Sequence, residues 1–193
     1  MPRFTRARAA VLAIALGVAA CSGSATTSFD PTGPCTSDGS APGAYPALEA
    51  QVPKMLIGAK PEHLDSGRHC TAAALGSLAT SGVTELRFAG GTWAFGAERA
   101  AALAVFTAPG LTAEQMAGFY LAGAQAADRT QVLAQSKPML AGRRGFRLDT
   151  QTGVRLQTVE VWPASVGDVV NVVITNDLPD ARIADAVSAF GSN

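Results

Sequence analysis

Three regions with different apolar patterns follow one another along the chain. Residues 9–20 form an unbroken apolar run, AAVLAIALGVAA, which follows three arginines and no acidic residue. Residues 22–44 consist mainly of Gly, Ser, Thr, Pro and Ala, and such a segment buries too little apolar surface to fold alone. From residue 45 onward, apolar positions recur at helix and strand periods. The pattern therefore predicts a leader (1–20), a tether (21–44) and one folded domain (45–193).

Three stretches of the domain carry the signals of helices. Thr71 is placed to cap a helix over residues 71–81. A second helix begins at Thr112, which is spaced from Gln115 as in a capping box. Pro179 occupies the first turn of a last helix, whose buried stripe consists of Ile183, Val187 and Phe190.

The second of these helices combines apolar and small residues on its inner face. The spacing predicts one buried stripe formed by Met116, Phe119, Tyr120, Gly123 and Ala127. A glycine within a helix costs about 1 kcal/mol relative to alanine, and this helix contains Gly118 and Gly123. We therefore expect close packing against a neighbouring element to compensate for the two glycines.

Strand patterns occupy most of the remaining domain. Strands are predicted at residues 83–95, 101–107, 131–135, 144–150, 154–162 and 168–175. Between Phe88 and Trp93 the apolar positions change parity, and a bulge at Gly90-Gly91 is the simplest explanation. Runs of consecutive strands with few helices predict an α+β fold: a mostly antiparallel sheet with helices packed on one face, in a single domain.

The first 21 residues resemble the signal peptide of a bacterial lipoprotein. The 12-residue apolar run is shorter than the roughly 20 residues that a membrane-spanning helix needs. The last three residues of the run and the cysteine that follows read Val18-Ala19-Ala20-Cys21, which resembles a lipobox. The resemblance implies cleavage before Cys21 and palmitate-type lipidation of its thiol, so that the protein is anchored on the exported side of a cell membrane or outer membrane. The alternative is an ordinary signal peptide cleaved after Ala20.

Charge and composition change the list of expected partners. The chain has 15 basic and 15 acidic residues, so its net charge is zero. Removing the three leader arginines leaves 12 basic residues and a net charge of −3. Proteins that bind nucleic acid usually carry a basic excess, and none is present here. We therefore expect the lipid to hold the protein at the membrane, with an envelope protein or the cell wall as partner and no nucleic acid.

Two cysteines remain once Cys21 is assigned to the lipid. Cys35 and Cys70 form an even pair in a protein that is expected to be exported, and export favours a disulfide. A redox or metal role is the alternative, but the pair lacks C-x-x-C spacing. We predict a Cys35–Cys70 bond that joins the end of the tether to the domain.

Four residues are candidates for ligand binding. His63 and His69, the only histidines, lie in residues 62–70, which also hold Glu62 and Asp65 and are predicted to be a loop. These side chains are of metal-ligand types, but their spacing matches no zinc template, and no metal or other cofactor is predicted. Trp93 and Trp162 are candidate aromatic platforms, with core packing as the alternative.

A basic segment is the last candidate feature. Arg143, Arg144 and Arg147, with Lys137 nearby, would form a patch that contacts anionic head groups or cell-wall polymers. The alternative is that these side chains are simply solvated.

The sequence contains no catalytic motif that dictates a reaction. It has no G-x-S-x-G, S-x-x-K or H-E-x-x-H pattern. We therefore expect a lipid-anchored cell-envelope protein that acts as a non-catalytic binding or assembly module. The alternative is an envelope hydrolase, or a small-ligand or metal carrier, with a site near the His63–His69 segment.

Overall fold

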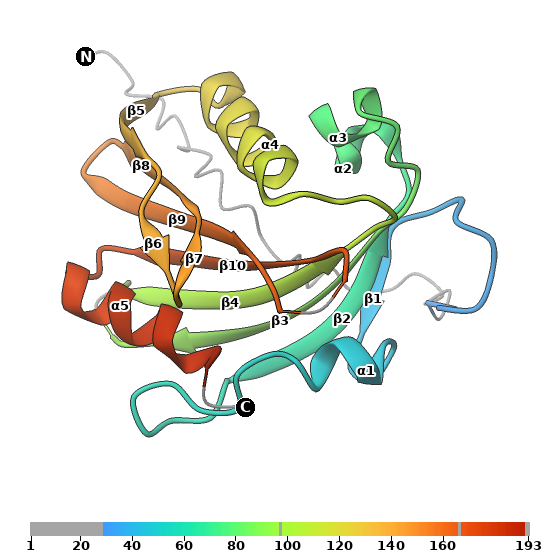
Figure 1. Ribbon diagram of the computed structural model, residues 1–193, viewed down its shortest axis with the longest axis horizontal. Coiled ribbons are helices and arrows are strands. Elements are labelled where there is room, and N and C mark those ends of the chain that lie inside the picture. The colour runs from blue at the N-terminus through green and yellow to red at the C-terminus, as the bar shows by residue number, and fades with distance from the viewer. Residues whose placement is uncertain (1–28, 97, 166, 192–193) are drawn as a thin grey trace, which may run out of the picture.

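Antiparallel pairing organises the chain into one large sheet, with helices on both of its faces (Figure 1). The computed structural model describes residues 29–96, 98–165 and 167–191. The predicted signal peptide, Cys21 and tether residues 22–28 lie outside the described residues. Across the described ranges, no helix is long and apolar enough to cross a membrane.

Eight strands form this sheet, and every neighbouring pair is antiparallel. In spatial order they are β1 (Gly39–Ala41), β2 (His63–His69), β3 (Leu86–Ala94), β4 (Ala100–Thr107), β10 (Val169–Asn176), β9 (Arg155–Pro163), β8 (Phe146–Thr152) and β5 (Thr130–Ser136). Two short strands, β6 (Met139–Leu140) and β7 (Arg143–Arg144), form a separate hairpin. The helices are α1 (Pro46–Glu49), α2 (Ala72–Leu75), α3 (Ser77–Thr80), α4 (Ala113–Ala126) and α5 (Asp180–Ala189).

Two hydrophobic clusters lie on opposite faces of the sheet. One contains buried residues of α2, α3 and α4, and the other contains buried residues of α1 and α5. The mostly antiparallel α+β fold is thus as predicted, but the helices are not confined to one face. The reason lies in the central strands: in β4, Ala104 and Phe106 belong to the first cluster, and Leu103 and Val105 to the second. A strand that is apolar on both faces must be covered on both.

Strand β3 changes its apolar parity without a bulge. Its register with β2 and with β4 is continuous, so the predicted bulge at Gly90-Gly91 is wrong. Phe88 packs in the first cluster and Trp93 in the second, which accounts for the parity change. Gly91 instead makes room for an aromatic ring, because a Cβ there would lie 2.9 Å from the Trp93 indole.

Strand β2 occupies the segment predicted to be a loop. It pairs with both β1 and β3, although its inner positions include the polar residues Ser66 and Arg68. Ser66 is satisfied at this position because its hydroxyl donates to Glu49 at 2.8 Å and accepts from the Tyr45 backbone N–H at 2.7 Å. Buried polar groups with partners are compatible with a strand, but they hide it from an analysis of apolar periodicity.

The first described residues form a segment that lies against the domain, here called the strap (residues 29–41). The buried Arg68 guanidinium donates to the carbonyl oxygens of Gly33 at 2.8 Å, Pro34 at 3.0 Å and Asp30 at 3.2 Å. The strap ends in β1, which pairs with β2. The predicted tether therefore does not extend to residue 44: residues 39–41 are part of the sheet.

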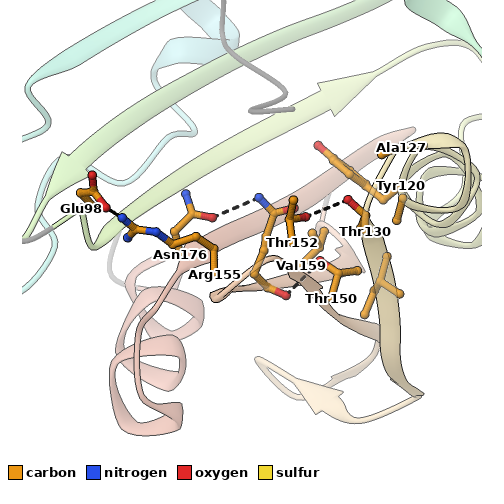
Figure 2. A pocket seen from close by; sticks show the side chains of 13 residues that line it. Glu98, Tyr120, Ala127, Thr130, Thr150, Thr152, Arg155, Val159 and Asn176 are labelled. Carbon is orange, nitrogen blue, oxygen red and sulfur yellow. Dashed lines mark hydrogen bonds and ion pairs between the residues drawn. The ribbon is translucent and has the colours of Figure 1, made fainter. Parts of the chain in front are cut away.

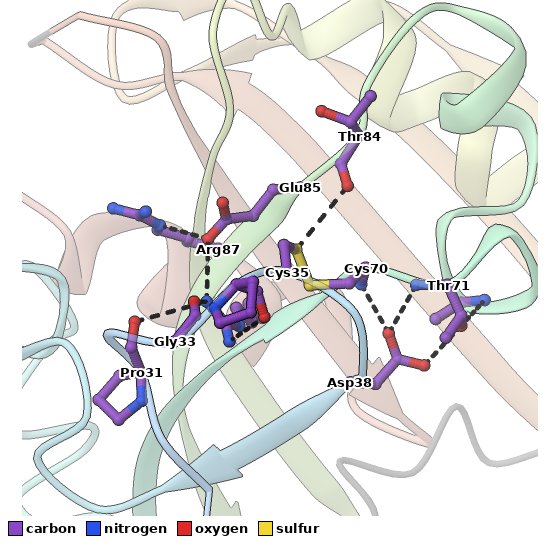
Figure 3. Close-up of a disulfide and its surroundings, with 12 residues drawn as sticks. Pro31, Gly33, Cys35, Asp38, Cys70, Thr71, Thr84, Glu85 and Arg87 are labelled. Atoms are coloured by element: carbon purple, nitrogen blue, oxygen red, sulfur yellow. Dashed lines mark hydrogen bonds and ion pairs between the residues drawn. A yellow bond between two sulfur atoms is a disulfide. The ribbon is translucent and has the colours of Figure 1, made fainter.

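The predicted disulfide between Cys35 and Cys70 is confirmed, and it fastens the strap to the end of β2 (Figure 3). The two Cα atoms are 5.4 Å apart. Beside the disulfide, the Asp38 carboxylate accepts hydrogen bonds from the backbone N–H groups of Cys70 at 2.6 Å and Thr71 at 3.0 Å. Covalent and polar contacts thus hold the same short segment.

Both predicted helix caps are present. The Thr71 hydroxyl accepts from the Ala74 N–H, and Thr112 and Gln115 form a reciprocal capping box at the start of α4. The helix predicted over residues 71–81 is divided into α2 and α3 by Gly76, whose φ of +50° lies in the left-handed region that favours glycine.

Candidate functional site

The second half of α4 covers a hollow of about 320 Å³ above the outer strands of the sheet. This α4 hollow lies between Tyr120, Gly123 and Ala124 of the helix, with its C-cap Ala127, and side chains of β5, β8, β9 and β10 (Figure 2). Leu148 and Val159 supply apolar surface from the strands. The hollow is thus bordered mainly by one helix and one face of the sheet, which are both regular elements, and it is open to solvent at its rim.

Small side chains on α4 leave this space unfilled. Met116 is fully buried in the first half of the helix, whereas the corresponding positions two and three turns later are Gly123 and Ala127. A Cβ at Gly123 would meet no heavy atom within 4 Å, and the same holds for Gly118. The close packing expected at the two glycines is therefore wrong: both positions adjoin open space.

Most polar groups around the α4 hollow are paired with one another. The hydroxyls of Thr130 and Thr152 share a hydrogen bond of 2.7 Å. The Gln157 amide donates to Asn176 Oδ1 at 3.1 Å. At the rim, Arg155 forms ion pairs with Glu98 and, at 2.9 Å, with Asp177. These groups need no further partner, so they contribute shape and a polar rim.

Tyr120 is the exception to this pairing. Its side chain is only 4% exposed, and its ring extends from α4 into the space that Figure 2 shows. Within the part of the chain that the structure describes, its hydroxyl makes no hydrogen bond, and the oxygen reaches the open space of the hollow. Burial raises the pKa of the phenol far above its ordinary value, so the group stays neutral. The hollow therefore holds one neutral hydroxyl with hydrogen-bonding capacity to spare.

A second hollow of about 310 Å³ adjoins the first. It shares Tyr120, Leu148 and Val159 with the α4 hollow, and Lys137 and Phe146 lie at its far side. The two hollows thus flank Tyr120 along α4.

The two tryptophans are core residues. Trp93 is 2% exposed and Trp162 is 1% exposed, and both pack in the cluster below α5 and α1. The Trp93 indole N–H donates to the Ala59 carbonyl at 3.0 Å, and Trp162 forms a T-shaped ring contact with Phe190. Neither ring is available as a ligand platform.

The two histidines are not brought together. They occupy opposite ends of β2: His63 is exposed, while His69 stacks on Phe88 with ring centroids 4.9 Å apart. Burial lowers the pKa of His69, and the nearby Asp38 opposes this effect. Over the described ranges, no group of three or more His, Cys, Asp or Glu side chains is placed to hold a metal.

Arg147 is not available to the predicted basic patch. Arg147 is engaged by carboxylates: it contacts Asp149 at 3.0 Å, Asp180 at 2.8 Å and Glu160 at 3.8 Å. Arg143 and Arg144 are exposed on β7, and the Lys137 ammonium lies 5.1 Å from the centre of the Phe146 ring. The exposed cations of the predicted patch are thus Arg143 and Arg144 on β7 and Lys137, two residues before β6.

Sequence reasoning missed both Tyr120 as a site residue and the carboxylates around Arg147. Tyr120 was assigned to the buried stripe of its helix, and only the small residues that follow it at positions 123 and 127 signalled space. Glu160 lies opposite Arg147 in the β8–β9 register and is 4% exposed. Burial raises its pKa to about 6, Arg147 opposes that rise, and Asp149 and Asp180 add to it.

Comparison with known proteins adds no family. No protein-family model matches the chain, and a search of the curated proteins finds no relative.

Proposed function

We propose that the protein is a lipid-anchored, non-catalytic binding module of the cell envelope and that it binds through the α4 hollow. The lipobox-like sequence at Cys21 supports the anchor. One observation carries the binding role: a preformed hollow between rigid elements with one free hydroxyl inside it. Such concave, largely apolar sites with few polar groups are typical of ligand binding.

The chemistry of the lining supports binding rather than turnover. The threonine hydroxyls in the hollow are bonded to each other or, for Thr150, to the Gln157 carbonyl, and not to a base that would activate them. The charged residues of the lining, Arg155 and Glu98, are paired with each other. A partner held here would be recognised by shape and by the Tyr120 hydroxyl.

The anchor is tested by metabolic labelling with a palmitate analogue. We expect the wild-type protein to be labelled and to fractionate with membranes, because two or more acyl chains give stable anchoring. Cys21→Ser should abolish the label and release the protein. Equal labelling of both proteins would overturn the anchor.

The binding role is tested by photo-crosslinking in intact cells. A photoreactive residue at Ala124, which lines the hollow, is compared with the same residue at Ala122, which is exposed two residues earlier on α4. We expect a discrete adduct from position 124 that is missing from position 122. Identical adduct patterns, or none at position 124, would overturn binding in the hollow.

A further inference from the structure

We propose that the α4 hollow takes a neutral, largely apolar ligand that carries one hydrogen-bonding group and that the Tyr120 hydroxyl pairs with that group. This inference rests on the proposed function, because it names the ligand class for the same site. It assigns Tyr120 as the residue that determines which apolar molecules are accepted.

The walls determine the apolar character of the ligand. Leu148 and Val159 face the hollow from the sheet, and the Tyr120 ring and Ala124 face it from α4. A hollow of about 320 Å³ is at the small end of ligand sites in proteins, which span about 300–1,000 Å³. The neighbouring hollow, which shares Tyr120, gives an extended molecule room to continue.

The hydrogen-bond inventory determines how many polar groups the ligand needs. Thr130 is satisfied by Thr152, and Gln157 by Asn176, so neither pair gains from a ligand. The Tyr120 hydroxyl is the group within the described lining that has no partner, although its side chain is more than nine-tenths buried. The Tyr120 oxygen itself reaches the open space of the hollow, so a hydrogen-bonding group on the ligand can pair with it there.

The charges of the lining favour a ligand without net charge. Arg155 and Glu98 neutralise one another at the rim, and Arg155 has a second carboxylate partner in Asp177. An ionic ligand would have to leave water for a site with no unpaired opposite charge, which is unfavourable. A hydroxyl or carbonyl group on an apolar chain meets no such barrier.

The experiment uses the full chain with Cys21→Ser, because an unlipidated protein needs no detergent that would absorb the probe. The neutral dye N-phenyl-1-naphthylamine is titrated by fluorescence, and 1-decanol is then used to displace it. Ala124→Leu fills the hollow, and Ala122→Leu is its matched control on the exposed face of the same helix. Ala127→Leu enters the same hollow and replaces Ala124→Leu if that variant does not fold.

We expect Ala124→Leu to raise the Kd of the dye at least tenfold and Ala122→Leu to leave it unchanged. Tyr120→Phe should weaken displacement by 1-decanol about three- to tenfold, as expected for one hydrogen bond. It should not lower the melting temperature of the free protein, because no internal hydrogen bond is lost. Tyr45→Phe, which removes the chain's other phenol hydroxyl, should leave the affinity for 1-decanol unchanged.

Each contrary result overturns a defined part of the proposal. Equal dye affinity of the Ala124→Leu and Ala122→Leu proteins would overturn the site. Equal 1-decanol affinity of the Tyr120→Phe and wild-type proteins would overturn the role of Tyr120. Failure of the wild type to bind either probe, together with a hollow-specific adduct in cells, would overturn the ligand class and leave the proposed function standing. Failure of both experiments would overturn both.

Discussion

The strand register places the Glu160 carboxylate at a buried position, where its charged form is unfavourable. It lies opposite Arg147 on β8 and opposite Val173 on β10, on the sheet face that carries the second hydrophobic cluster. Its nearest cation, Arg147 Nη1, is 3.8 Å away and is shared with Asp149 and Asp180. The ion pair therefore offsets only part of the desolvation, and the carboxyl remains easy to protonate.

Glu160→Gln should stabilise the protein at alkaline pH. The folded-state pKa of about 6 lies above the ordinary 4.5, so the folded state binds the proton more tightly than the unfolded state. The stability contribution of Glu160 is therefore full below pH 4.5 and is lost as the pH rises through 6. The substitution removes the penalty of the charged form, a gain of about 2 kcal/mol at pH 8 that vanishes near pH 4.5.

The measurement is urea unfolding of both proteins between pH 4.5 and pH 8. Arg147 keeps Asp149 and Asp180 as partners, so the substitution leaves no orphaned cation. Glu62→Gln, at an exposed position before β2, is the matched control for the loss of one carboxylate. A Glu160→Gln protein that is less stable than wild type at pH 8 would contradict the assignment.

Arg68 does more for stability than its single ion pair suggests. Its guanidinium is 4% exposed and donates to several strap carbonyls, whereas its distance to Glu85 is 3.9 Å. Arg68→Met should lower the free energy of unfolding by about 3 kcal/mol, because a buried charged donor forms strong hydrogen bonds with carbonyl oxygens. Arg182→Met, which breaks an exposed pair with Asp185, should cost less than about 0.5 kcal/mol. Similar losses for the two variants in urea unfolding would rule out the strap contacts as the cause.

At the scale of elements, replacing glycine by alanine should have opposite effects on stability at two positions. Gly123 adjoins open space, so Gly123→Ala should stabilise the protein by about 1 kcal/mol through helix propensity. At Gly145 a Cβ would lie 2.6 Å from Leu140 Cδ1 and 2.8 Å from the Val161 carbonyl oxygen. Gly145→Ala should therefore lower the melting temperature while Gly123→Ala raises it. Differential scanning calorimetry of both variants checks this, and a lower melting temperature for Gly123→Ala would show that the hollow does not tolerate a methyl group.

The elements that local chemistry specifies were predictable, and those that depend on distant partners were not. The capping box at Thr112 and the apolar strand around Val105 are determined by residues that are adjacent in the sequence, and both are present. Strand β2 owes its burial to Arg68 contacts more than 30 residues away in the sequence, which no local period reveals. The candidate site was missed for a related reason. The helix period predicts that Tyr120 faces the sheet, but it does not reveal whether the space between helix and sheet is filled.

At the scale of the whole molecule, the strap brings the domain closer to the predicted anchor. A tether to residue 44 would have left the domain remote, but Phe29 onward lies against the domain. From Cys21 to Phe29 there are eight residue steps, so even a fully extended chain reaches at most about 28 Å. If Cys21 carries lipid, the domain and its α4 hollow are held within a few tens of ångströms of the membrane surface, where apolar ligands are concentrated.

The Cys35–Cys70 disulfide and Arg68 hold the strap by independent means, so their contributions should separate. The bond closes a loop over a sequence separation of 35, which the chain-entropy model converts to about 4 kcal/mol of stability. Reduction should therefore lower the free energy of unfolding by about this amount but leave the strap in place, because Arg68 and the β1–β2 pairing remain.

Reduction of the Arg68→Met protein removes both restraints, and limited proteolysis should then cut within residues 29–41. In unreduced wild type and in each singly perturbed protein the strap should resist the same protease. Equal cleavage after reduction alone would mean that the disulfide by itself holds the strap against the sheet.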